Sequence, residues 1–91
     1  MNKEYYWKIK NGEQRTEIRP NNHHGWNSKN IFPGRTINFS MGYGKAERML
    51  REISNTIVTH DLRQEDISED HIAAVENIYG KRDSWLVARV C

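Results

Sequence analysis

An asparagine-rich loop spans residues 20–34 (PNNHHGWNSKNIFPG) and holds side chains suited to ligand recognition. Loops of this length in a compact domain are usually functional or disordered, and the apolar residues within this one argue against disorder. We expect Ile31 and Phe32 to dock on the core and Trp26 to be exposed on a projecting tip, because its neighbours are polar. The candidate binding residues of the loop are His23, His24, Trp26 and Lys29.

Other aromatic and cationic candidates flank this loop in the chain. They are Tyr6, Lys8, Arg15, Arg35, Lys45 and Arg48. Single-stranded RNA or DNA is bound when bases stack on aromatic rings while cations follow the phosphates. The combination favours nucleic acid as the partner. By contrast, Trp7 and Trp85 are expected to fill the core.

The charge distribution supports this interpretation. The net charge is only +2, but residues 1–48 hold nine Lys/Arg against four Glu, whereas residues 49–91 hold five Lys/Arg against eight Asp/Glu. Such an asymmetry predicts one basic side that faces a negative partner. Chance clustering on a solvated surface is the competing explanation.

Four histidines raise the question of metal or hydrolytic chemistry. His23 and His24 are adjacent, but no acid or cysteine lies nearby to complete a metal site, so no metal or cofactor is expected. Hydrolysis as in metal-free ribonucleases would need a histidine beside a cation such as Lys45 or Arg48. Sequence separation leaves that convergence open, and no catalytic residue is assigned.

A glycine turn follows the strand predicted at residues 35–41. Its sequence, GYGKAERML, has Ala46 where a Walker loop needs a hydroxyl residue. The run resembles the pyrophosphate loop of GNAT acetyltransferases, in which Gly-x-Gly opens a helix after a strand. That resemblance spans nine residues and implies a small acetyltransferase-like protein, although Phe39 stands where the family has Arg or Gln.

The elements that position these residues are predicted from periodicity and turns. Asn11-Gly12 between two alternating segments, residues 4–10 and 13–19, predicts a β-hairpin with a type I′ turn. In this register Tyr6, Lys8 and Arg15 share an exposed, basic sheet face, with Lys8 opposite Arg15.

The chain after the long loop is predicted to form two strands with two helices between them. A strand at residues 35–41 is followed by helices at 45–57 and 68–79, and then by an interior strand at 85–90. Expected caps are Asp61 for a short turn, Ser68 at the second helix and Gly80 beyond it. The predicted fold is one α+β domain over residues 1–91: a four-stranded mixed sheet (β-hairpin, long loop, β-α-α-β) with two helices packed on one face.

The single cysteine, Cys91, excludes an internal disulfide, and no apolar run reaches the length of a membrane span. A cytoplasmic protein is expected, and a dimer through an edge strand is as compatible with the sequence as a monomer. We interpret the chain as a non-enzymatic nucleic-acid-binding domain. The alternative is a protein-binding inhibitor or adaptor that blocks a nucleic-acid-processing enzyme, with the acidic connector 61–70 as a second contact.

Overall fold

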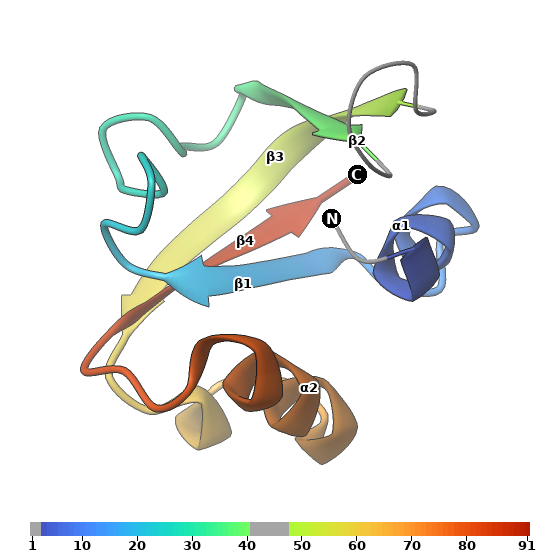
Figure 1. Ribbon diagram of the computed structural model, residues 1–91. Helices are drawn as coiled ribbons and strands as arrows, with labels where there is room; N and C mark the ends of the chain where they lie inside the picture. Colours follow the sequence, from blue (N-terminus) through green and yellow to red (C-terminus); the bar gives the residue numbers. More distant parts are fainter. Residues whose placement is uncertain (1–2, 41–47) are drawn as a thin grey trace.

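The computed structural model describes residues 3–40 and 48–91, which form a four-stranded sheet with two helices (Figure 1). In chain order the elements are α1 (Lys3–Lys10), β1 (Thr16–Pro20), β2 (Thr36–Ser40), β3 (Arg48–Thr59), the 3₁₀ turn η1 (Leu62–Gln64), α2 (Glu69–Tyr79) and β4 (Trp85–Val90). The α+β class is confirmed. The predicted mixed sheet is wrong: the strand order is β1-β4-β3-β2, and every neighbouring pair is antiparallel.

Strand β4 is central and is buried on both faces, as its apolar sequence predicts. Leu86, Ala88 and Val90 belong to the core cluster that includes α1, whereas Trp85 and Val87 belong to the cluster that includes α2. Because alternate residues of a strand point to opposite faces, the two helices cover opposite faces of the sheet. The prediction that both helices pack on one face is therefore wrong.

The predicted N-terminal hairpin is replaced by helix α1 and strand β1. Tyr6 and Ile9, three residues apart, are buried on one side of the helix. The Asn11 amide donates to the Trp7 carbonyl and the Gly12 amide to the Ile9 carbonyl, so Asn-Gly ends a helix instead of closing a hairpin. Gly12 has φ +79°, the left-handed conformation common at helix ends. Only the second predicted strand survives, shifted to Thr16–Pro20.

The helix predicted at residues 45–57 is also wrong, because residues 48–59 form the long strand β3. Residues 48–52 pair with β2, and residues 53–59 pair with β4, with an irregularity in the register between Ile53 and Asn55. A cluster of β-branched residues at 56–59 suits a strand better than a helix. The glycine turn, with Gly42, Gly44 and Lys45, lies outside the described residues. A GNAT-like loop requires a helix after this turn, but the chain from Arg48 onward is a strand.

The other predicted elements are confirmed. Strand β2 occupies most of the segment 35–41 and buries Phe39. The Ser68 hydroxyl accepts from the His71 amide at the start of α2, and Gly80 ends that helix. The Asp61 carboxylate caps η1 by accepting from the Arg63 amide. No helix in the described part of the chain is long and apolar enough to cross a membrane.

Candidate functional site

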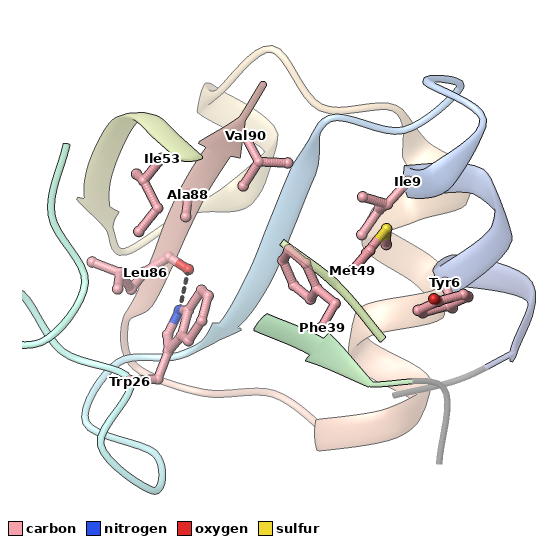
Figure 2. Close-up of a cluster of buried hydrophobic side chains, with 9 residues drawn as sticks. All are labelled: Tyr6, Ile9, Trp26, Phe39, Met49, Ile53, Leu86, Ala88 and Val90. Atoms are coloured by element: carbon pink, nitrogen blue, oxygen red, sulfur yellow. Dashed lines mark hydrogen bonds between the residues drawn. The ribbon is translucent and has the colours of Figure 1, made fainter. Parts of the chain in front are cut away.

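The two aromatic residues proposed to stack on bases are both buried. Tyr6 is 0% exposed within the core, and its hydroxyl has no hydrogen-bond partner among the described residues. Trp26 is 5% exposed, and its indole N–H donates to the Leu86 carbonyl at 2.9 Å (Figure 2). Neither ring is available to a nucleobase. The prediction that Trp26 is exposed is wrong because a polar loop can still carry one apolar anchor to the core.

The loop around Trp26 is held by its own polar side chains. The Asn27 carboxamide oxygen accepts from the amides of Lys29 and Asn30, and the Asn30 side chain donates to the Gly25 carbonyl. Ile31 is partly buried against the core, as predicted, but Phe32 is 44% exposed. Residues 20–34 are thus a docked cover on the α1 face of the sheet.

Arg19 links strand β1 to this cover. Its guanidinium lies 4.8 Å from the Trp26 ring centroid and forms a 3.2 Å ion pair with Glu17. Burial raises the pKa of the Glu17 carboxyl above its ordinary value, while the charge of Arg19 and its hydrogen bond act in the opposite direction. This cation is already engaged by a carboxylate and an indole.

Among the described residues, His23 and His24 contact aromatic rings and do not belong to a metal site. The rings of His23 and His24 lie 4.2 Å apart, and His23 also contacts Tyr79 at 5.4 Å. Burial, then the charges of His24, Arg82 and Arg19, lower the pKa of His23. In the part of the chain that the structure describes, no three His, Cys, Asp or Glu side chains come together as metal ligands.

The remaining predicted cations are dispersed. Lys8 forms an ion pair with Glu4 on helix α1 at 3.3 Å, so it does not face Arg15 across a hairpin. Arg35 donates to the Asn30 carbonyl at 2.6 Å, and Lys29 and Arg48 are exposed elsewhere. Lys45 lies outside the described residues. The predicted basic sheet face therefore does not form among the described residues.

One pocket of about 240 Å³ nevertheless collects cations where α1 ends and β1 begins. Its charged side chains are Lys10, Arg15 and Arg51, and no Asp or Glu side chain of the described residues lines it. Apart from these it is lined by Ile9, Asn11, Gly12, Gln14, Val90 and Cys91. We call it the basic pocket.

Backbone hydrogen bonds between distant segments assemble the basic pocket. The Gln14 amide donates to the Lys8 carbonyl, which folds the chain back after Gly12, and the Val90 amide donates to the Arg15 carbonyl, which ties this turn to β4. Arg51 comes from β3 and donates to the Leu50 carbonyl at 2.8 Å. Residues 10–15 and strand β3, far apart in sequence, therefore bring three cations to one place.

An exposed aromatic ring adjoins this pocket. Trp7, predicted to be a core residue, is 37% exposed, and the Lys10 ammonium lies 4.9 Å from its ring centroid. Trp7 sits one residue after the buried Tyr6, with the two rings in an edge-to-face contact at 5.7 Å. The structure thus places a solvent-accessible indole beside Lys10, one of the three cations of the basic pocket, which the sequence interpretation did not foresee.

Two other hollows are less suited to an anion. One pocket has three cations in its lining, Arg63, Lys81 and Arg82, but also two acids, Asp61 and Glu76. Arg63 is paired with Glu69 and Glu76 at 3.5 and 3.2 Å. A wider hollow of about 590 Å³ between the loop and β2 has Arg35 as its one Lys or Arg among the described lining residues.

Of the predicted site residues that the structure describes, only Arg15 lines the basic pocket. Lys10, Arg51 and Trp7 were missed, because Arg51 was assigned to a helix and Trp7 to the core. The β-branched run after Ile53 is the signal that could have identified β3 as a strand. Comparisons with protein-family models, with curated proteins and with solved structures return no match for this chain.

Proposed function

We propose that this protein is a non-enzymatic module that binds single-stranded nucleic acid, with the phosphates at the basic pocket and a base on Trp7. The observation that carries the proposal is the convergence of Lys10, Arg15 and Arg51 around one pocket without an acidic side chain among its described lining residues. Phosphate oxygens are the ligands that guanidinium and ammonium groups favour.

The distribution of acids gives the molecule an orientation relative to such a ligand. Residues 60–80, which contain η1 and α2, carry six Asp/Glu and one Arg. They cover the sheet face opposite α1. A polyanion is repelled from this layer and attracted to the end of α1, so the charge asymmetry of the sequence becomes an asymmetry between two sides of the fold.

Trp7 offers a stacking surface for a base, a contact that a free phosphate ion would not make. Its indole is partly exposed and already lies against Lys10. A base stacked on such a ring contributes roughly 1–3 kcal/mol and does so with little sequence preference. The proposed ligand is therefore a strand in which the phosphate and a neighbouring base bind together.

Binding, not catalysis, is proposed because the described lining of the pocket offers no His, Asp or Glu side chain as a general acid or base. The cytoplasm is the proposed compartment, since the exposed Cys91 carries a free thiol, which a reducing environment preserves.

The test is a fluorescence titration with single-stranded RNA and DNA oligonucleotides of equal length at low and moderate salt. Three phosphate contacts predict that log K falls with log salt at a slope of about −2, roughly 20-fold between 50 and 200 mM. The double variant Arg15→Gln, Arg51→Gln should lose most of this affinity and most of the slope.

Arg48→Gln is the matched control, because Arg48 is an exposed arginine outside the basic pocket. Equal binding by the double variant and wild type, with weakening only in Arg48→Gln, would move the interface away from the pocket. Absence of binding to either nucleic acid at low salt would reject the proposal and favour a protein target instead.

A further inference from the structure

Strand β3 is longer than the strand that covers its outer edge. It runs over twelve residues, Arg48–Thr59, but β2 pairs only with residues 48–52. Beyond Ile53, which bonds to Arg35 and Gly34, β3 pairs with only one strand of the described chain, β4. Figure 1 shows β3 continuing well past β2. We call residues 54–59 the open edge of β3.

The hydrogen-bonding phase of β4 identifies which backbone groups are open. The Val90 amide donates to the Arg15 carbonyl, and the Ser84 carbonyl accepts from the Asn21 amide. The backbone N–H and C=O groups of even-numbered β4 residues therefore point towards β1, and those of odd-numbered residues point towards β3. The partners of these odd residues are Asn55, Ile57 and Thr59. The N–H and C=O groups of Thr56 and Val58 therefore point to the open edge, and no backbone hydrogen bond among the described residues outside the sheet reaches them.

The open edge lacks the usual protection against strand pairing. Its sequence, SNTIVT, has no charge and no proline, although exposed edges are commonly blocked by one or the other. Ile57 and Val58 are each 42% exposed. The opposite edge strand, β1, instead carries Glu17, Arg19 and Pro20.

We propose that two copies of this chain associate by antiparallel pairing of their open edges, with the two-fold axis at Ile57. In this register Thr56 of each copy lies opposite Val58 of the other, and these pairs exchange four backbone hydrogen bonds, two for each narrow pair. Ile57 of one copy faces Ile57 of the second copy. The result is one continuous eight-stranded sheet with an isologous interface.

A second copy fits this edge in charge as well as in the pattern of its backbone hydrogen bonds. The paired segment is uncharged, so two-fold symmetry brings no like charges together. At its ends, Arg35 precedes β2 beside Ile53, and Asp61 follows β3. Antiparallel pairing brings Asp61 of the second copy to the Arg35 end, where the charges are opposite. This interface is remote in the sheet from the basic pocket and does not depend on nucleic-acid binding.

Sedimentation velocity over a wide range of protein concentration tests the proposal. Wild type should shift from monomer towards a species of twice the mass as its concentration rises. Ile57→Lys should stay monomeric, because two ammonium groups then meet at the two-fold axis. Ile78→Lys makes the same change on α2, where Ile78 is 54% exposed, and should dimerise as wild type does. Circular dichroism of each variant checks that it is folded.

A cross-link gives a readout that does not rely on loss of association. Residues that face each other in a wide antiparallel pair have Cα atoms about 4.5 Å apart, within the range of a disulfide. On a Cys91→Ser background, Ile57→Cys should form a covalent dimer on mild oxidation several-fold faster than Ile78→Cys. A monomer at every concentration, equal cross-linking by both variants, or a dimer that survives Ile57→Lys would each overturn the proposal.

Discussion

The indole N–H of Trp26 donates to the carbonyl of Leu86, 60 positions later in the chain, at 2.9 Å. This bond fastens the long loop to the central strand β4. It also explains why the loop is ordered without helix or strand: one buried aromatic anchor and one satisfied polar atom fix its middle.

Trp26→Ala should destabilise the protein by on the order of 3–5 kcal/mol, because it removes a buried aromatic side chain. Trp26→Phe should cost less, about 1–3 kcal/mol, through the lost hydrogen bond and a smaller ring. Chemical denaturation followed by circular dichroism measures both. Unchanged midpoints would mean that the loop is not docked on the sheet.

Gly12→Val should destabilise by at least about 1–2 kcal/mol, because φ at this position is +79° and a β-branched residue tolerates the left-handed region poorly. An added Cβ would meet nothing within 4 Å, so steric contact with the rest of the protein adds little. Gly12→Asn is the matched control, since asparagine accepts this conformation better. Equal thermal stability of the two variants would contradict a left-handed turn after α1.

Trp7 should contribute mainly to oligonucleotide binding, whereas Trp26 should contribute mainly to stability. Trp7→Leu should weaken oligonucleotide binding by roughly 1–3 kcal/mol while changing unfolding little, because the ring is partly exposed. The measurement is a titration with a dye-labelled oligonucleotide, since the variant alters intrinsic fluorescence. Wild-type affinity in Trp7→Leu would remove the indole from the proposed interface.

His71 should make stability depend on pH. The Gln14 amide group donates to His71 Nδ1 at 2.6 Å, which requires that nitrogen to be unprotonated. Burial, and then the charge of Lys8, lower the pKa of His71 from its ordinary 6.5. As the pH falls, His71 is therefore protonated in the unfolded chain before it is protonated in the folded protein. The free energy of unfolding should fall as pH drops from 6.5 towards the lowered pKa of the folded protein.

Unfolding free energies of wild type and His71→Gln across this pH window measure the effect. The variant should show a shallower decline than wild type. Parallel curves for wild type and His71→Gln would contradict the assignment.

Local signals predicted the chain after residue 60 well. Ser68 and Gly80 mark the ends of α2 through contacts within a few residues, so sequence alone identifies them. The N-terminal segment misled because its signals are ambiguous. Asn11-Gly12 serves a hairpin or a helix end equally well, and an eight-residue segment with apolar residues on most sides fits either period.

The binding site was harder to predict because it is assembled by tertiary contacts. Arg15 and Arg51 meet only because β1 and β3 both pair with β4, and no local pattern encodes that proximity. Trp26 illustrates the same limit: its polar neighbours suggest exposure, but its burial is decided by Leu86 at the far end of the chain.

The position of β4 has a consequence for how the protein is made. This strand lies in the middle of the sheet, yet it is the last of the elements to leave the ribosome. Until it emerges, β1 has no strand to pair with, and β2 and β3 can form only a hairpin. Both core clusters include residues of β4, so neither can close during synthesis of the preceding segments. Folding of this domain is therefore expected to wait for β4 and to be all-or-none, with the nascent chain exposing apolar strands until β4 has emerged.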